Sequence, residues 1–167
     1  LQRIFRKAAT AQGSTPIKIA GLDNVLIRYA RCCEPLAGDR IVGFITRGRG
    51  VSIHRKDCLQ IMNSDPQRLI PVQWESDVEE PRKVRITLVA SDRTGLLAAV
   101  STAVSNCGVS ILYSDTTVHQ ETNKALINFE IMVNSSEHLN KIRRAIEMVP
   151  GVIKVERVIS KTNELNS

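Results

Sequence analysis

Residues 125–133 read ALINFEIMV, and this alternation of apolar and polar positions predicts a β-strand with one buried face. Similar alternation recurs on both sides of this stretch, in residues 84–88, 109–113 and 152–159. Two segments with helical spacing of apolar residues lie between these strands, at 96–107 and 139–149. The second half of the chain therefore has the element order β-α-β-β-α-β.

Turn and cap residues support this order. Gly108 follows the first helical segment, Ser135-Ser136 precedes the second, and Pro150-Gly151 ends it. Short strands with one apolar face need helices on that face. We therefore expect an α+β fold, with a ferredoxin-like four-stranded antiparallel sheet covered by two helices.

The first half of the chain is shorter and less regular. It offers candidate strands at residues 25–29, 41–45, 51–53 and 71–74, and a short helix that Asp57 could cap and that runs through Ile61. Between the second and third of these strands, TRGRG at residues 46–50 indicates a hairpin turn. Trp74 is expected in the core. About fifty residues form a marginal core, so a metal or a docked partner would be a natural added constraint.

Composition fits two small domains. The 167 residues are 43% hydrophobic, and no apolar run approaches the ~20 residues that span a membrane. The chain starts at Leu1 without Met or an export signal, so we expect a fragment of a longer cytoplasmic protein with reduced cysteines. The expected segments are the end of an upstream helical region and a linker (1–22), a first module (23–76), a linker (77–83), a second module (84–160) and a tail (161–167).

Three of the four cysteines lie near the only histidine of the first half. Thiolate and imidazole groups suit Zn²⁺, and the candidate ligands are Cys32, Cys33, His54 and Cys58. His54 and Cys58 have suitable spacing, whereas adjacent residues on an extended strand face opposite ways, which makes Cys32-Cys33 a poor pair. The alternatives are buried cysteines with a hydrogen-bonded histidine, or a Cys-His catalytic pair with Cys33 or Cys58 as nucleophile. No oxyanion-hole loop accompanies such a pair. Cys107 is expected to be a small core residue.

The basic excess lies at the N-terminal side. Residues 1–60 hold 11 Lys+Arg against 4 Asp+Glu, a balance of +7, whereas the whole chain carries +6. Glycines allow backbone amides to approach phosphates, and arginine donates to phosphates in a bidentate way. With only 4% aromatic residues, we expect contact with the backbone of folded RNA rather than base stacking. The alternative is a solvated turn. The candidate RNA-binding residues are Arg28, Arg31, Arg40, Arg47, Arg49, Arg55 and Lys56.

The turn before the first helix of the second module is a candidate ligand site. Free amide groups at a helix N-terminus suit a carboxylate, and Gly95 would allow its close approach. The start of the next strand could complete such a pocket across a dimer. The candidate residues are Asp92, Arg93, Thr94, Gly95, Leu96, Leu97, Asn106 and Ile111. The alternative is that Asp92 or Thr94 merely caps the helix.

Two motifs carry a family resemblance. RCCEPLAGD at residues 31–39 and GFITRGRGVSIHRKDC at 43–58 resemble the C-terminal regulatory region of RelA/SpoT-type guanosine tetra- and pentaphosphate synthetases/hydrolases, the stringent-response factors. Residues 23–76 are similar to their zinc-finger-like, ribosome-intersubunit domain, and residues 84–160 resemble their ACT domain.

The resemblance implies a non-catalytic fragment that regulates upstream catalytic domains of the same chain. It implies docking on the ribosome, with large-subunit rRNA and acceptor-site tRNA as partners, and restraint of synthesis away from the ribosome. It also implies a structural zinc ion, a branched-chain amino acid as ACT ligand, and pairing of ACT domains. Whether the parent both makes and degrades the alarmone stays open. The alternative function is a free-standing, amino-acid-sensing ACT regulator with a metal-stabilised module, and RNA binding by the hairpin separates the two.

Overall fold

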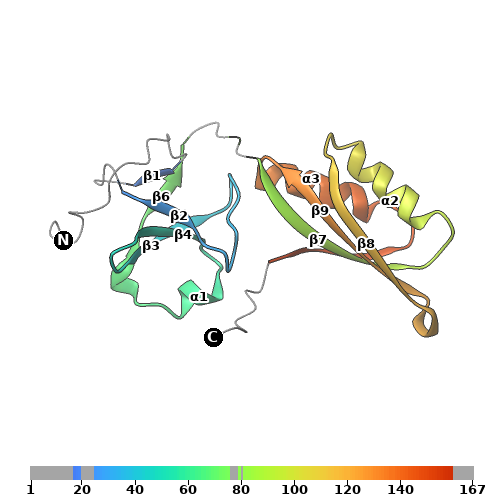
Figure 1. Cartoon of the computed structure of the whole chain (residues 1–167), viewed down its shortest axis with the longest axis horizontal. Coiled ribbons are helices and arrows are strands. Elements are labelled where there is room, and N and C mark those ends of the chain that lie inside the picture. The colour runs from blue at the N-terminus through green and yellow to red at the C-terminus, as the bar shows by residue number, and fades with distance from the viewer. Residues whose placement is uncertain (1–16, 20–24, 76–78, 80, 160–167) are drawn as a thin grey trace. The chain divides into compact units, whose positions relative to one another are not determined.

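The computed structural model describes residues 17–19, 25–75, 79 and 81–159 (Figure 1). The chain divides between residues 78 and 79 into two compact units. The first unit takes in residues 17–19 and 25–75, and the second runs from Glu79 to Val158. Among the described residues, no helix has the length and apolar character needed to cross a membrane.

The first unit is built around a β-hairpin. Strands β3 (Ile41–Thr46) and β4 (Gly50–Arg55) pair antiparallel across the glycine-rich turn, which confirms the predicted hairpin. Strand β2 (Ile27–Tyr29) runs parallel to β4, and β5 (Leu69–Ile70) pairs with β3 on the other side. A separate antiparallel pair joins β1 (Ile17–Ile19) to β6 (Val72–Trp74). Helix α1 (Leu59–Met62) and the 3₁₀ turn η1 (Pro66–Arg68) connect β4 to β5.

The core of the first unit is small. It has two buried clusters. Cys33, Cys58 and Ile61 form one. The other comes from four strands and consists of Ile17, Ile41, Val51, Ile53 and Val72. Trp74 is partly buried against this cluster, stacks with Tyr29 at 6.0 Å between ring centroids, and donates from Nε1 to the Asp39 carbonyl at 2.9 Å. Gly50 has φ +83°, and a Cβ there would lie 2.1 Å from the Leu26 carbonyl oxygen. The hairpin can therefore close against the chain before β2 only with glycine at this position.

The second unit confirms the predicted α+β fold. Its strands are β7 (Arg82–Ser91), β8 (Ile111–His119), β9 (Lys124–Val133) and β10 (Val152–Val158). They form one antiparallel sheet in the order β10-β7-β9-β8. Helices α2 (Leu96–Ser105) and α3 (Ser136–Glu147) cover one face of it, and the 3₁₀ turn η2 (Gln120–Thr122) links β8 to β9 (Figure 1).

Buried and partly buried residues alternate along β9, and the buried ones form the centre of the core of the second unit. Ile127, Phe129 and Ile131 are fully buried on the helix face of the sheet, where they meet the buried sides of both helices. Burial of each such side chain contributes about 1.5–3 kcal/mol relative to exposure. The helix residues of this core are Val100, Val104, Ile142 and Ile146. As predicted, Ser135 caps α3, and its hydroxyl accepts from the His138 amide at 3.1 Å.

Some local predictions are corrected by the structure. Helix α1 has Cys58 as its N-cap residue, without a side-chain cap, because the Asp57 carboxylate is instead bound by the Arg55 guanidinium. Strand β7 begins at Arg82, two residues inside the segment expected to be a linker, because Arg82 and Lys83 pair with the end of β9. Of the helical end and linker expected at residues 1–22, residues 17–19 instead form β1, which pairs with β6, and the other residues lie outside the described part, as does the tail at 161–167.

Candidate functional site

Three segments of the first unit bring the predicted ligand atoms together. Cys32 and Cys33 lie in the turn that follows β2, His54 lies near the end of β4, and Cys58 precedes α1. Because β2 runs parallel to β4, its chain leaves the sheet beside His54, with the Ala30 amide donating to the Ile53 carbonyl at 2.9 Å. The three sulfurs and one imidazole nitrogen all lie within 4.8 Å of one another, so the cluster could hold a metal ion.

Both adjacent cysteines face the histidine. His54 Nδ1 lies 3.4 Å from the Cys32 sulfur and 3.7 Å from the Cys33 sulfur, and Cys32 lies 3.6 Å from the sulfur of Cys58. The expectation that Cys32 and Cys33 point in opposite directions was wrong. It assumed an extended strand, whereas residues 31–33 form a turn, which lets neighbouring side chains converge.

A second layer of contacts orients the cluster. The Ser52 hydroxyl lies 3.0 Å from His54 Nε2, so the other ring nitrogen, Nδ1, is left facing the sulfurs. The Arg55 amide donates to the Cys33 sulfur at 3.3 Å. The Phe44 ring meets the imidazole edge-on, with 6.5 Å between centroids. Such outer contacts set the tautomer and orientation of a metal-binding histidine.

Burial favours the neutral forms of Cys32, Cys33 and His54 when no cation is bound. It raises the pKa of the Cys33 thiol to about 12, and burial together with the neighbouring Cys58 raises the pKa of Cys32. Burial also lowers the pKa of His54. A nucleophilic cysteine needs a lowered pKa, so this environment disfavours Cys33 as the nucleophile of a Cys-His catalytic pair. A divalent cation reverses the balance, because it stabilises thiolates directly.

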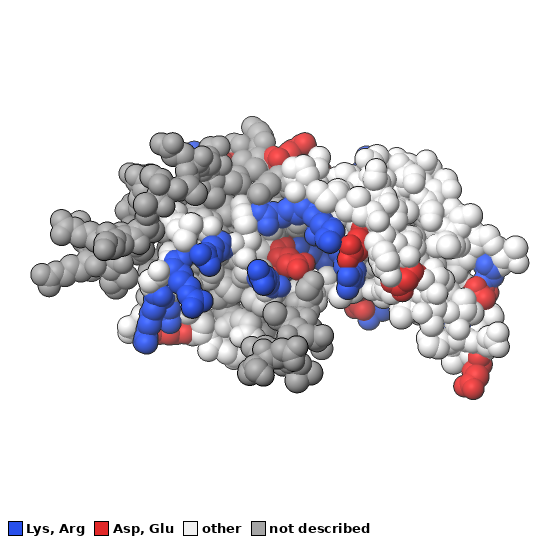
Figure 2. All heavy atoms as spheres, in the orientation of Figure 1, with Lys and Arg blue, Asp and Glu red and all other residues white. Residues whose placement is uncertain are grey.

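The candidate RNA-binding residues fall into separate groups on the first unit. Arg47 and Arg49 are exposed on either side of Gly48 at the hairpin tip. The other end of the hairpin, about 20 Å away along six-residue strands, carries Arg40 and Lys56, whose amide donates to the Arg40 carbonyl. Arg31 and Arg55 belong to that same end, and Arg28 lies on β2. Figure 2 shows Lys and Arg side chains gathered on one face of this unit.

One of these cations is already neutralised. Arg55 is half-buried and its guanidinium binds the Asp57 carboxylate through both Nε and a terminal nitrogen. Arg68 was not among the predicted basic residues, although its side chain packs against the hairpin. Its guanidinium carbon lies 4.4 Å from the centre of the Phe44 ring, and its Nε donates to the Ile45 carbonyl at 2.9 Å. Five of the six predicted arginines are exposed, among them Arg47 and Arg49 at the hairpin tip, and only Arg55 is partly buried.

The predicted amino-acid site is not assembled within one chain. Gly95 is the N-cap of α2 and Asn106 is its C-cap, so ten helical residues, about 15 Å, separate them. Ile111 follows on β8, beyond the C-terminal end of α2. The turn itself is braced by other loops, since the Asp92 amide donates to the Asn123 carbonyl and Arg93 Nε donates to the Pro150 carbonyl.

The alternative role of this turn as a side-chain cap is also corrected. The N-cap position of α2 is occupied by Gly95 at φ +78°, and no side chain caps the helix. Leu96 is buried beneath the turn, whereas Leu97 is 43% exposed and Thr94 is exposed. The amide groups at this helix end are therefore not covered by the side chain of Asp92 or Thr94.

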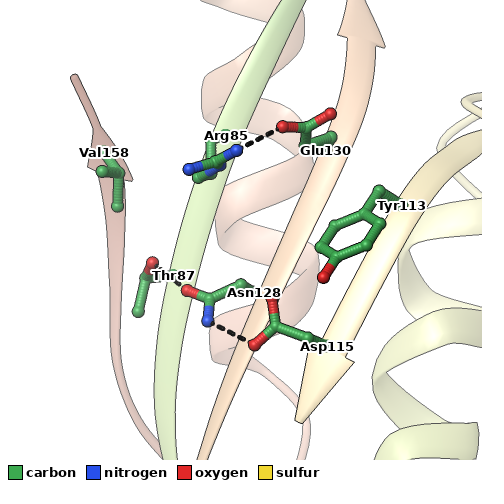
Figure 3. Close-up of a pocket in the computed structure, with 7 residues that line it drawn as sticks. All are labelled: Arg85, Thr87, Tyr113, Asp115, Asn128, Glu130 and Val158. Atoms are coloured by element: carbon green, nitrogen blue, oxygen red, sulfur yellow. Dashed lines mark hydrogen bonds and ion pairs between the residues drawn. The ribbon is translucent and has the colours of Figure 1, made fainter. Parts of the chain in front are cut away.

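A hollow of about 410 Å³ lies on the sheet of the second unit, among side chains of β7, β8, β9 and β10 (Figure 3). It was not predicted. Its lining residues are Arg85, Thr87, Tyr113, Asp115, Asn128, Glu130 and Val158. The one signal in the sequence is that Asn128 and Glu130 occupy the polar positions of the most apolar strand.

Comparisons with known proteins match both units. Residues 17–75 match the family model described as the RelA/SpoT RIS domain, and residues 79–157 match the ACT domain model. GTP pyrophosphokinase of Myxococcus xanthus is 37% identical over 142 residues, which cover 85% of this chain and 19% of that protein. The Escherichia coli K12 protein of the same name is 31% identical over 165 residues, covering 95% of this chain and 22% of that protein.

The chain thus spans about a fifth of the length of these curated relatives. A solved crystal structure, the ACT domain from GTP pyrophosphokinase of Chlorobium tepidum, covers 47% of this chain and 100% of its own, with 20% identity and a TM-score of 0.43.

Proposed function

Since the chain belongs to the RelA/SpoT family, as a C-terminal regulatory region made of a RIS domain and an ACT domain, we propose that it regulates a GTP pyrophosphokinase by docking it on the ribosome. In this proposal the fragment is not catalytic, and the catalytic domains of the same polypeptide are its first partner. The second partner is ribosomal RNA, together with tRNA in the acceptor site.

The hairpin tip is the observation that carries this proposal. Arg47 and Arg49 are exposed on a glycine-rich turn, and neither has a carboxylate partner among the residues that the structure describes. Guanidinium groups on a narrow turn can enter an RNA groove and bind phosphates in a bidentate way. Co-sedimentation with ribosomes at increasing salt tests the proposal, because phosphate contacts make binding salt-dependent.

We also propose that the Cys/His cluster binds one structural zinc ion. Tetrahedral zinc, with Zn–S of about 2.3 Å and Zn–N of about 2.0–2.1 Å, requires about 3.8 Å between sulfurs and about 3.6 Å between sulfur and nitrogen. The Cys32–Cys58 separation of 3.6 Å and the Cys–His54 separations of 3.4 and 3.7 Å fit these values. Four protein ligands would close the coordination sphere, as in structural rather than catalytic sites. The ion would hold the hairpin, the turn after β2 and α1 together.

Substitution Ser52→Ala tests the second layer of this site. It removes the hydroxyl at His54 Nε2 while leaving all four ligands in place, so zinc affinity is expected to fall roughly 10- to 100-fold. Competition with a chromophoric chelator measures this affinity. Ser64→Ala is the matched control, because the Ser64 hydroxyl bonds the Ile61 carbonyl in the same unit without contacting the cluster. Equal zinc affinities in the two variants would contradict the proposal that Ser52 orients His54 for binding.

For the ACT domain we propose an amino-acid site shared between two copies. One copy would supply the amides at Gly95 and the other would supply Asn106 and Ile111, because one chain keeps these groups about 15 Å apart. A branched-chain amino acid would place its carboxylate on the helix N-terminus and its side chain against exposed Leu97 or Ile111.

Two substitutions of Gly95 distinguish the effect of an added negative charge on ligand binding from the effect of backbone strain. A Cβ at Gly95 meets open space, and asparagine tolerates the left-handed conformation found there. Saturating valine or isoleucine should stabilise the wild type and Gly95→Asn by about 2.7 kcal/mol at a hundredfold excess over Kd, and should not stabilise Gly95→Asp, whose carboxylate repels the ligand. Calorimetric melting measures the gain. Unchanged melting of the wild type with valine, isoleucine and leucine would remove the site.

A further inference from the structure

We propose that the open face of the ACT sheet carries a binding site for an arginine side chain presented by a polypeptide partner. This face lies opposite the helices and shows the polar positions of β7, β8 and β9 side by side. Figure 3 shows Tyr113 and Asp115 projecting from β8 toward Asn128 and Glu130 on β9. The site shares no residue with the Cys/His cluster, with the hairpin tip or with the turn at Gly95.

A hydrogen-bonded row fixes one carboxylate in the hollow. The Thr87 hydroxyl donates to Asn128 Oδ1 at 2.5 Å, and Asn128 Nδ2 donates to Asp115 Oδ2 at 2.9 Å. Because Thr87 occupies the amide oxygen, the amide nitrogen of Asn128 has to face Asp115. The row therefore holds Asp115 through Oδ2 and leaves its Oδ1 to accept from a ligand.

The negative charge of Asp115 favours a cationic ligand beside its Oδ1 atom. The other carboxylate of the hollow, Glu130, is bound by Arg85 at 2.5 Å and by Lys83 at 3.3 Å, and these two cations hold the pKa of Glu130 below its usual range. Asp115 makes no ion pair within the described part of the chain: it accepts a hydrogen bond from the neutral amide of Asn128, and Arg85, which it attracts, is bound to Glu130. A ligand with cationic N–H donors would complete the row.

Tyr113 distinguishes a guanidinium from an ammonium. It pairs across the strands with Glu130, it is 53% exposed, and its ring lies next to Asp115 on the same face (Figure 3). A planar guanidinium can stack on this ring and present two N–H groups to one carboxylate, whereas an ammonium offers a single point charge. Val158 gives the hollow an apolar wall for the methylene stem, and about 410 Å³ is ample for one such side chain.

The surroundings favour arginine within a polypeptide over the free amino acid. A free amino acid would bring its own carboxylate beside those of Asp115 and Glu130, with Arg85 already engaged. Strand β8 is the last in the sheet order, so its outer edge is open to a partner chain running beside Tyr113 and Asp115.

An NMR titration of the 167-residue chain tests this site with four small probes. N-acetyl-arginine amide should give saturable amide shifts at residues 85–87, 113–115 and 128–130. N-acetyl-lysine amide should bind several-fold more weakly, and the isosteric but neutral N-acetyl-citrulline amide about tenfold more weakly or not at all. Free arginine should bind no more tightly than its capped form, and tighter binding of free arginine would overturn the polypeptide source.

Two variants connect the binding to the residues. Asp115→Asn keeps an acceptor for Asn128 but removes the charge, and should weaken capped arginine about tenfold. Tyr113→Leu should abolish the preference for arginine over lysine. Glu121→Gln, an exposed carboxylate on η2, is the matched control and should bind as the wild type does. Shifts that are absent, that are equal for citrulline, or that survive Asp115→Asn unchanged would overturn the proposal and would leave the zinc and ribosome proposals unaffected.

Discussion

Removal of the zinc ion proposed at the Cys32, Cys33, His54 and Cys58 cluster is expected to unfold the RIS domain and to leave the ACT domain folded. The turn after β2 is also joined to the hairpin by the Ala30–Ile53 and Arg55–Cys33 hydrogen bonds. The buried cluster that packs there consists of Cys33, Cys58 and Ile61, so two of its three residues are proposed ligands, and helix α1 is only four residues long. Structural zinc sites contribute about 10–16 kcal/mol of apparent binding free energy at neutral pH, which exceeds the stability of most small domains. The two units are separate compact units, so unfolding of the RIS domain should not unfold the ACT domain.

The measurement is an NMR amide spectrum before and after chelation, with elemental analysis of the purified chain. Resonances of residues 25–75 should collapse to unfolded positions, while those of 82–158 stay dispersed. Cys58→Ser should reproduce the effect of the chelator. Cys107→Ser is the matched control, because Cys107 lies in the ACT domain and its thiol bonds the Ala103 carbonyl. A chain that contains no stoichiometric zinc under reducing conditions and remains folded would end the proposal.

Replacing Arg47 and Arg49 together by alanine is expected to weaken ribosome binding on the order of 100-fold at low salt. Each exposed guanidinium is proposed to bind one phosphate, and hydrogen bonds to charged groups contribute about 1.5–3 kcal/mol each. The slope of log affinity against log salt should become shallower by about 1.4–1.8, since each phosphate contact contributes about 0.7–0.9. Quantitative sedimentation at several salt concentrations measures both quantities.

A matched variant separates the hairpin from net charge. Lys141→Ala with Arg144→Ala removes the same two charges from exposed positions on α3 of the ACT domain. It should leave the affinity and the salt slope close to those of the wild type. If both double variants weaken binding equally, the effect comes from net charge rather than from the hairpin. If neither weakens binding, the hairpin does not contact the ribosome. Arg55 is unsuited to this test, because Asp57 already neutralises it.

Periodicity made most of the ACT domain predictable. Strand β9 buries every second residue from Ala125 to Val133, so its sequence shows one face directly. Helix α3 was predictable for a similar reason, since Leu139, Ile142 and Ile146 recur at helical spacing after a serine cap. These elements are long enough for a repeating pattern to outweigh local exceptions.

The RIS domain was predicted less completely because its elements are short. Strands β1, β5 and β6 have two or three residues, too few for a period to show, and β1 pairs with β6 across more than fifty residues of chain. The turn at residues 31–33 that aims two adjacent cysteines at His54 depends on the parallel pairing of β2 with β4, which is a tertiary feature.

The candidate sites show the same division. The four cluster residues could be selected by type and spacing, but their convergence could not be derived. The seven basic residues were selected by charge. Their distribution over the two ends of the hairpin and strand β2, and the ion pair between Arg55 and Asp57, appear only in three dimensions. The hollow at Asp115 joins residues of four strands, and its row of hydrogen bonds has no counterpart in sequence order.

Cryo-EM of the 167-residue chain bound to ribosomes, with uncharged tRNA in the acceptor site, tests the central claim most directly. The account predicts density for the RIS domain against large-subunit rRNA, with Arg47 and Arg49 at the hairpin tip within hydrogen-bonding distance of phosphates. A bound chain whose residues 46–50 face solvent, or a chain that contacts only ribosomal proteins, would contradict the account.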